Sequence, residues 1–273
     1  MDGMTIRLEY PLDPRPRYGY GSPPHRRLFE IIGSRRREYS RHLQSFLRHA
    51  AALCKIPHDP VTDPAMPHWN NDFIPPLDAV AIYGFCVELQ PRRVIEIGSG
   101  NSTKFFRYAI ASNGLSCRLV SIDPQPRAEI DNLCDEVIRE PLENVPSALF
   151  SELEAGDIVF FDGSHLVYTN SDVTVFYLEI LPALRPGVFV HMHDIFLPED
   201  YPPEWTERYY SEQYLLACYL LSGNPGFEIE LANRFVTGDP ELRGLLKPLW
   251  DELGIAERGQ QGGSFWVRKT GGR

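Results

Sequence analysis

Four acidic residues lie at or near the ends of apolar segments and are the first candidates for chemistry. They are Glu96, Asp123, Asp162 and Asp194. Carboxylates can bind ammonium groups, ribose hydroxyls or a divalent cation, and they can accept a proton. The apolar segments resemble strands of an open α/β sheet, and ligands of such sheets bind beyond the carboxyl ends of the strands. We therefore expect the four acids to face one crevice.

A glycine-rich turn follows the first of these segments. Gly98 and Gly100 allow the backbone to turn sharply and to approach a ligand closely, and a helix predicted over residues 102–110 would point free N–H groups at the turn. Asn101 or Ser102 would cap that helix. The turn has Thr103 where a dinucleotide-binding loop has its third glycine, and it does not match the phosphate-binding P-loop. The pattern predicts a loop for a nucleotide cofactor.

The pattern from Glu96 to Gly100, E-x-G-x-G, resembles motif I of class I S-adenosylmethionine-dependent methyltransferases. Asp123 ends the next predicted strand, where a ribose-binding carboxylate belongs. The segments Asp-Gly-Ser-His at 162–165 and His-Asp at 193–194 resemble a bacterial branch, the methyltransferase 24 type. They are more distantly similar to the catechol and caffeoyl-CoA O-methyltransferases. The resemblance covers roughly residues 69–195 and implies S-adenosylmethionine as the cofactor.

The resemblance also implies which residues bind that cofactor. The helix after the glycine turn would hold the methionine carboxylate, Leu142 would cover the adenine, and the segment before residue 77 would cover the cofactor and touch the acceptor. Trp69 fits this pocket or the core equally well. The expected cofactor-binding residues are Asn71, Phe73, Glu96, Gly98, Ser99, Gly100, Ser102, Asp123, Pro124, Leu142, Asp162, Gly163 and Ser164.

Methyl transfer to a hydroxyl group requires alignment of the reactants and removal of a proton, by a base or with the help of a metal ion. His165 stands where the catechol-type relatives have a lysine base, and its alternative role is to hydrogen-bond its own loop. Asp162 and Asp194 match acids that bind a divalent cation in those relatives, and the third predicted ligand is His193. The cation would be Mg²⁺ or a similar ion. The relatives have asparagine where this chain has Ile195.

Two other functions remain open. The histidines at 165, 191 and 193, with the neighbouring acids, contain enough ligands for a 2-His-1-carboxylate iron site, as in a hydroxylase. His191 shares a strand face with His193 and is also expected in the core. A non-catalytic, cofactor-binding scaffold is the third hypothesis. The favoured one is O-methylation of a small hydroxylated acceptor, such as a sugar, a natural-product intermediate or an envelope glycan precursor.

The elements that must position these residues follow from the same resemblance and from hydrophobic periodicity. We expect a Rossmann-like, doubly wound α/β sheet of about seven strands whose last strand is antiparallel. Residues 57–273 would form the methyltransferase domain, with a lid at about 195–214 and a variable excursion at about 237–262. Segments 227–231 and 264–267 alternate like edge strands. Residues 1–56 would form a basic N-terminal arm followed by helices that bend near Gly33 and Ser34.

Composition limits the remaining choices. The 273 residues carry a net charge of −10, which argues against a nucleic-acid enzyme. No apolar run is long enough to span a bilayer and the first residues lack signal-peptide features, so we expect a cytoplasmic protein. The five cysteines are scattered without a C-x-x-C pair, which predicts reduced thiols. The arginines at 35, 36, 37 and 41 would pack against the acidic body, a second subunit or an anionic surface, and a homodimer would form through the N-terminal helices.

Overall fold

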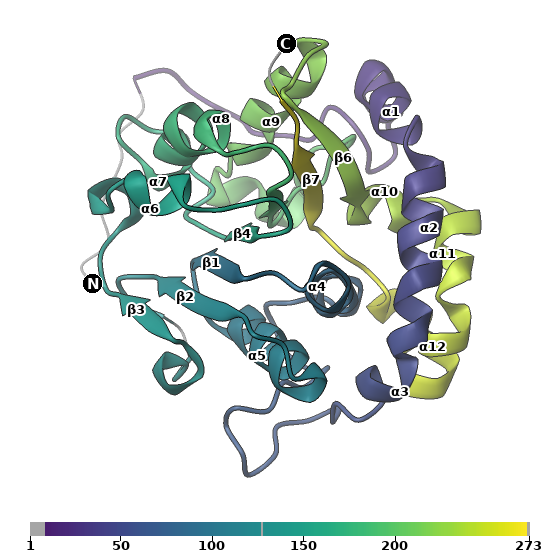
Figure 1. Ribbon diagram of the computed structural model, residues 1–273. Helices are drawn as coiled ribbons and strands as arrows, with labels where there is room; N and C mark the ends of the chain where they lie inside the picture. The colour runs from purple at the N-terminus through teal and green to yellow at the C-terminus, as the bar shows by residue number, and fades with distance from the viewer. Residues whose placement is uncertain (1–8, 127, 272–273) are drawn as a thin grey trace.

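A seven-stranded sheet forms the centre of the computed structural model, which describes residues 9–126 and 128–271 (Figure 1). The strand order is β3-β2-β1-β4-β5-β7-β6. Strands β1 to β5 run parallel, whereas β7 is antiparallel to both of its neighbours. The strands are β1 (Arg93–Ile97), β2 (Arg118–Ile122), β3 (Glu136–Ile138), β4 (Ile158–Phe161), β5 (Phe189–Met192), β6 (Phe227–Ala232) and β7 (Phe265–Lys269). The predicted Rossmann-like fold with an antiparallel last strand is confirmed.

Strand β7 lies inside the sheet, so its prediction as an edge strand was wrong. Phe265, Trp266 and Val267 are all buried, because β5 and β6 flank the strand and side chains cover both faces. The loop before β7 is tied to the end of β5, since the backbone N–H of Ile195 donates to the backbone O of Gly263 at 2.6 Å. The other predicted edge strand, β6, does lie at the edge.

Helices cover both faces of the sheet (Figure 1). Helices α4 (Pro76–Leu89) and α5 (Asn101–Asn113) lie on one face, and α7 (Asp172–Val175), α8 (Leu181–Ala183) and α9 (Glu212–Leu221) lie on the other. Pro76 occupies the first turn of α4, where a missing N–H costs nothing. The short elements between them are η2 (Asp131–Leu133), η3 (Leu142–Asn144), α6 (Ala148–Ser151), the π-helical segment η4 (Phe176–Ile180), η5 (Pro203–Arg208) and η6 (Glu257–Gly259).

The N-terminal helices pack against the outer edge of the sheet. They are α1 (Arg26–Gly33), α2 (Arg36–Phe46), η1 (Leu47–His49) and α3 (Ala50–Leu53), and the predicted break near Gly33 is present. Tyr39, Leu43 and Phe46 of α2 are completely buried and belong to the same core as the sheet. Because this apolar stripe is used within the chain, it offers no free face for a second subunit.

The basic residues of α2 face acidic residues of the body. Arg36 pairs with Asp239 and Glu241, and Arg35 lies 3.6 Å from Glu228. The predicted excursion at about 237–262 follows α10 (Asn233–Gly238) and is helical and partly buried, with α11 (Pro240–Leu245), α12 (Lys247–Leu253) and η6 within it. Packing against the body is therefore the role that the structure gives to Arg35 and Arg36.

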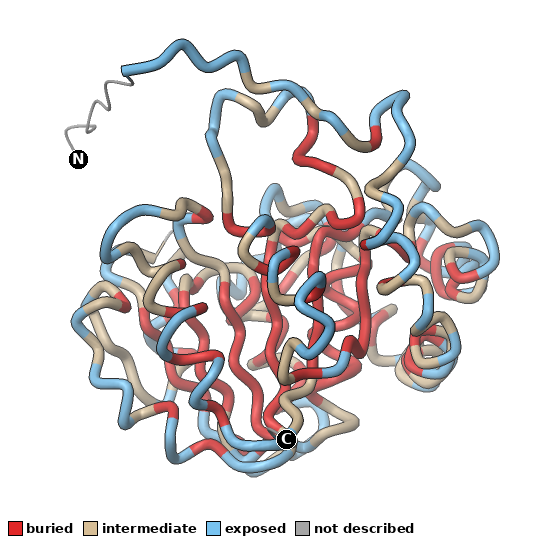
Figure 2. The backbone as a smooth tube through the Cα atoms, turned by 90° about the horizontal axis from the view of Figure 1, so that it is seen from above, coloured by how far each residue is buried: buried red, intermediate tan, exposed pale blue. Residues whose placement is uncertain are grey.

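The segment before α1 crosses the lid segment that follows β5. Asp200 accepts hydrogen bonds from the backbone N–H groups of Arg17 (2.6 Å) and Tyr18 (2.9 Å), and His25 N–H donates to Pro198 O. Figure 2 shows that buried residues concentrate in the sheet, whereas much of this N-terminal segment is exposed. Among the described residues, no helix has the length and apolar character needed to cross a membrane.

Candidate functional site

The loop after β1 has a geometry that only glycine fits at one position. Gly98 has a φ of +78°, and a Cβ on it would lie 1.8 Å from the backbone O of Asp162. The loop therefore passes directly over the end of β4. A Cβ on Gly100 would meet nothing within 4 Å, so the second glycine borders open space where a ligand can approach the backbone.

These two glycines give a matched pair of variants. Gly98→Ala should lower the free energy of unfolding by about 2–3 kcal/mol, because the methyl group would meet a backbone atom and the residue would keep an unfavourable φ. Gly100→Ala should change it by less than about 1 kcal/mol, since the added methyl group has room. Urea denaturation of both variants measures the difference. Equal loss of stability in the two proteins would contradict this geometry.

Thr103 caps the helix that follows the loop. Helix α5 begins at Asn101 with Gly100 as its N-cap, so the predicted caps Asn101 and Ser102 were wrong. Gly100 has no side chain to cap the helix, and Oγ1 of Thr103 instead accepts from Gly100 N–H at 3.0 Å. The same hydroxyl donates to Oε2 of Glu96 at 2.5 Å. One threonine thus joins the glycine loop to the acid of β1.

Glu96 is fully buried beneath the loop. Burial is the main cause that raises the pKa of Glu96, to about 8, and Asp162 raises it further, while the hydroxyls of Ser102 and Thr103 oppose the shift. Oε1 of Glu96 has no hydrogen-bond partner among the described residues. A buried acceptor without a partner is costly. A proton on Oε1, or a hydrogen-bond donor of a bound ligand, would remove this cost.

Asp123 lies across the loop from Glu96, at the end of β2. Its carboxylate accepts from the backbone N–H groups of Ser99 (2.8 Å) and Gln125 (2.7 Å), and each carboxylate oxygen can accept further bonds. Arg139 donates to the backbone O of Asp123 at 2.9 Å. Arg139 also lines a shallow depression of about 490 Å³ together with Asp131 and Asn132. The predicted ribose ligand is thus held beside the glycine loop.

The other predicted cofactor-binding residues differ in their exposure and in their contacts. Leu142 is buried and Pro124 is exposed. Ser164 is engaged elsewhere, because its N–H and Oγ donate to the two oxygens of Asp172 at 2.6 and 2.5 Å. Gly163 passes so close to this carboxylate that a Cβ would lie 2.2 Å from Oδ2 of Asp172. In this structure Ser164 therefore stabilises its own loop.

The segment before α4 lies near the end of β5. Trp69 is buried and its ring centroid is 6.0 Å from that of Phe105, as expected for a core residue. Asn71 shapes a turn, since its Oδ1 accepts from the N–H groups of Phe73 and Ile74. The side chain of Phe73 is 47% exposed, so it remains accessible to a ligand.

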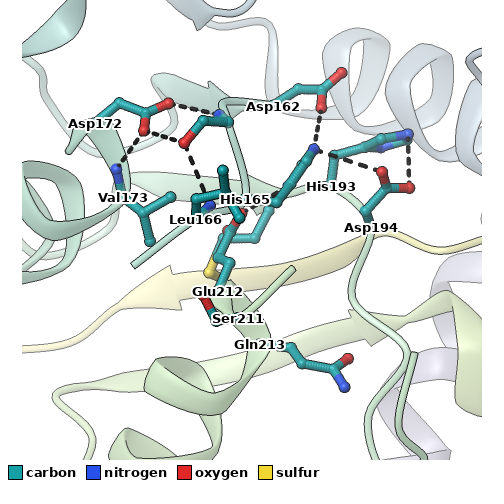
Figure 3. A network of polar contacts seen from close by, with 12 residues as sticks. Asp162, His165, Leu166, Asp172, Val173, His193, Asp194, Ser211, Glu212 and Gln213 are labelled. Atoms are coloured by element: carbon teal, nitrogen blue, oxygen red, sulfur yellow. Dashed lines mark hydrogen bonds and ion pairs between the residues drawn. The ribbon is translucent and has the colours of Figure 1, made fainter. Parts of the chain in front are cut away.

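Three predicted catalytic residues meet at the ends of β4 and β5. Ligand atoms of Asp162, His165 and Asp194 all lie within 4.8 Å of one another (Figure 3). Nε2 of His165 is 3.1 Å from Oδ1 of Asp162 and 3.5 Å from Oδ2 of Asp194. His165 and Asp194 have φ values of +61° and +54°, which are uncommon for residues other than glycine. Strained backbone of this kind concentrates at functional sites.

Glu212, which is not among the site residues predicted from the sequence, completes this cluster. It begins α9 and is fully buried, and its Oε2 lies 2.8 Å from Nδ1 of His165. Burial lowers the pKa of His165, but hydrogen bonds with Asp162 and Glu212 outweigh it and raise that pKa well above its usual value. Burial also raises the pKa of Asp194, against the opposing effect of His193 and His165. The imidazole is therefore held between carboxylates on both of its nitrogens.

His193, predicted as a metal ligand, borders this cluster: its Nε2 lies 3.8 Å from Oδ1 of Asp194, but it is not one of the three residues whose ligand atoms all lie within 4.8 Å of one another. Its Nδ1 is 3.5 Å from Nε2 of His191, and its Nε2 is 3.2 Å from the backbone O of Phe73. The ring of His191 stacks on that of Phe160, with the two ring centroids 3.8 Å apart. Burial lowers the pKa of His191 well below its usual value. His191 and His193 share a strand face, as expected from their spacing, and that face is turned into the core.

Aromatic side chains of the lid segment reach His165. The ring centroid of Tyr210 lies 4.6 Å from that of His165, and the Tyr210 ring also contacts Trp205. Arg208 places its guanidinium 3.9 Å from the centroid of Trp205. Trp205 in turn contacts Phe196, which follows Asp194 closely in the chain. Tyr210 of this segment thus lies directly against the histidine of the triad, beside the partly exposed rings of Trp205 and Phe196.

Residues 95–195 match the model of a protein family described as "Methyltransferase domain", the methyltransferase 24 type. The resemblance inferred from the glycine loop and the strand-end acids is thus confirmed for this central part of the chain. No curated protein matches the sequence.

Several solved structures are similar to this chain. A SAH-bound methyltransferase from Podospora anserina is 15% identical, covers 82% of this chain and 95% of its own, and has a TM-score of 0.46. An O-methyltransferase from Bacillus cereus in complex with SAH is 17% identical, covers 84% of this chain and 91% of its own, and has a TM-score of 0.42. The branched-chain polyamine synthase from Thermus thermophilus is 14% identical, covers 82% of this chain and 63% of its own, and has a TM-score of 0.42. These values are too low to relate the activities of those proteins to this chain.

Proposed function

We propose that the protein transfers a methyl group from S-adenosylmethionine to a hydroxyl group of a small acceptor, such as a sugar, a natural-product intermediate or an envelope glycan precursor. The convergence of Asp162, His165 and Asp194 beside the glycine loop supports this most strongly, because Gly98 touches the backbone of Asp162. A donor in the loop and a hydroxyl at the triad would be neighbours, as an in-line displacement requires.

The residues around the loop fit S-adenosylmethionine. Oε1 of Glu96 has no hydrogen-bond partner in residues 9–126 and 128–271, Gly100 borders open space, and Asp123 is held at the end of β2. In our proposal Asp123 binds the ribose hydroxyls, and the N–H groups at the start of α5 face the methionine carboxylate. When bound, this cofactor supplies an electrophilic methyl group on a positively charged sulfur.

The triad fits a divalent cation, because two carboxylates and one imidazole present ligand atoms within 4.8 Å of one another. In our proposal His165 replaces the predicted His193 as the nitrogen ligand. A cation held there lowers the pKa of an acceptor hydroxyl. The side chains of Asp162 and Asp194 are 27% and 19% exposed, against 5% for His165, so the carboxylates are the groups that can take the proton of the acceptor.

The same observations give less support to the two alternative functions, an iron-dependent hydroxylase and a non-catalytic scaffold. Among the described residues, the group whose ligand atoms all lie within 4.8 Å of one another contains one histidine, whereas an iron hydroxylase site of the 2-His-1-carboxylate type needs two, and the second histidine, His193, reaches only Asp194, at 3.8 Å. A non-catalytic scaffold would not need a second set of acids beside its cofactor loop. Binding of the cofactor without turnover of any hydroxylated acceptor would favour the scaffold.

Calorimetry of S-adenosylmethionine and its demethylated product tests the cofactor site. We expect micromolar binding to the wild type and at least a tenfold loss in Asp123→Ala, because two ribose hydrogen bonds would be lost. Asp251→Ala removes a similar carboxylate that pairs with Lys247 on α12 and should bind normally. Repeating the titration with Mg²⁺ then directs the acceptor screen. Absence of binding to the wild type would reject the proposed function.

A further inference from the structure

One short segment, residues 210–212, holds His165 from three directions. The Tyr210 ring packs against the imidazole, and the backbone N–H groups of Ser211 and Glu212 both donate to the backbone O of His165, at 2.8 and 3.1 Å. The Glu212 carboxylate meets Nδ1. The histidine comes from the loop after β4 and the segment precedes or begins α9, so two distant parts of the chain fix one ring (Figure 3).

We propose that Glu212 is a positioning residue that fixes the His165 ring with Nδ1 protonated and with Nε2 directed, as a cation ligand, toward Asp162 and Asp194. An ionised carboxylate can only accept, so Nδ1 must supply the hydrogen in the 2.8 Å contact. Nε2 is then the nitrogen that faces the two aspartates, and a cation bound there would displace the Nε2 proton to solvent while Nδ1 keeps its own. Carboxylates that hold metal-binding histidines in this way fix both the tautomer and the orientation of the ring. This inference rests on the proposed function.

The carboxylate is itself held in place. The hydroxyl of Tyr177 lies 3.4 Å from Oε1 of Glu212 and 3.1 Å from Sδ of Met192, which share its one hydrogen, and neither Tyr177 nor Glu212 is accessible to solvent. A buried carboxylate is costly unless it is paired. Within the described part of the chain, His191 is buried with no carboxylate hydrogen-bonded to its ring, which stacks on Phe160 and contacts His193. Packing a histidine in this core therefore does not require an acid, which favours a role for Glu212 in setting the ring.

The chain provides a matched control, because a second buried histidine–glutamate pair lies far from the triad. Nε2 of His42 is 3.0 Å from Oε2 of Glu230, which also binds Arg268. Glu212→Gln and Glu230→Gln are thus the same substitution in two buried pairs. Only the first pair includes a residue of the candidate cation site.

The experiment titrates Mn²⁺ alone into the full chain and follows free Mn²⁺ by electron paramagnetic resonance. Glu212→Gln should weaken Mn²⁺ binding by about 10- to 100-fold relative to the wild type. Glu230→Gln should bind Mn²⁺ as the wild type does, and both variants should bind S-adenosylmethionine normally without metal, which shows that they are folded. Unchanged Mn²⁺ affinity in folded Glu212→Gln would overturn the inference.

A nuclear magnetic resonance measurement separates this inference from the cation site itself. In ¹⁵N-labelled protein without metal, His165 should show a slowly exchanging proton on Nδ1, assigned by its loss in His165→Gln. That proton should exchange faster in Glu212→Gln. Wild-type protein that fails to bind Mn²⁺ but shows this proton would reject the cation site and retain the positioning of the ring. An Nδ1 without a proton would reject the positioning role.

Discussion

Replacing His165 by glutamine should lower the free energy of unfolding by about 3–5 kcal/mol, the cost of breaking a buried ion pair by removing one partner. The imidazole is 4% exposed and lies between Asp162, Asp194 and Glu212, so its removal leaves Glu212 fully buried without a cationic partner. Urea denaturation at pH 7 with a chelator present measures the loss. The deficit should shrink as the pH falls, because protonation neutralises the unpaired carboxylates.

A double-mutant cycle shows whether the pair is the cause. Adding Glu212→Gln to His165→Gln should recover part of the lost stability, since the unpaired charge is then absent. His42→Gln serves as the control and should cost less, because Glu230 keeps its contact with Arg268 at 2.8 Å. A His165→Gln protein as stable as the wild type would mean that the imidazole does not compensate the buried acids.

The second large effect concerns Glu96 and the pH dependence of stability. Its pKa is about 8 in the folded protein and 4.5 at its ordinary value, so between these pH values the folded state holds one more proton than the unfolded state. The contribution of Glu96 is therefore fully present below pH 4.5 and is lost as the pH rises toward 8, with a slope of up to about 1.4 kcal/mol per pH unit.

Glu96→Gln isolates this contribution. Glutamine has nearly the shape of a protonated glutamate and carries no charge to bury, so the variant should be more stable than the wild type near pH 8 and should lack the slope. Its affinity for S-adenosylmethionine should fall, because the carboxylate no longer meets the donor groups of the ligand. Parallel pH dependences of unfolding in the two proteins would show that Glu96 is already ionised in the folded state.

The acids of the site could be predicted because parallel strands impose a simple rule. Apolar runs with an acid at or near their carboxyl end identify Glu96, Asp123 and Asp162, and parallel pairing brings those ends to one edge of the sheet. The glycine spacing likewise predicted the close turn at Gly98. Local pattern was sufficient for these features because each depends on a few consecutive residues.

The set of residues around the candidate cation site was less predictable. His193 is adjacent to Asp194 in sequence, but its ring packs against His191 and its Nε2 stays 3.8 Å from Oδ1 of Asp194, which has a φ of +54°. Glu212 lies 47 residues beyond His165. The only sequence signal for it is an acid at the start of an otherwise apolar helix, which is also the usual place for a helix-stabilising charge.

The interior position of β7 has a consequence for how the protein acquires its native state. Strand β5 pairs with β4 early in the chain order, but its second neighbour arrives only after the lid, α9, β6 and helices α10 to α12. Contacts between such distant segments form slowly. Until β7 inserts, β5 presents an apolar, unpaired edge, and Ile195 lacks the Gly263 carbonyl that anchors the backbone beside Asp194. We therefore expect the insertion of β7 and the placement of Asp194 to be coupled, and folding intermediates that lack β7 should be both inactive and prone to aggregate.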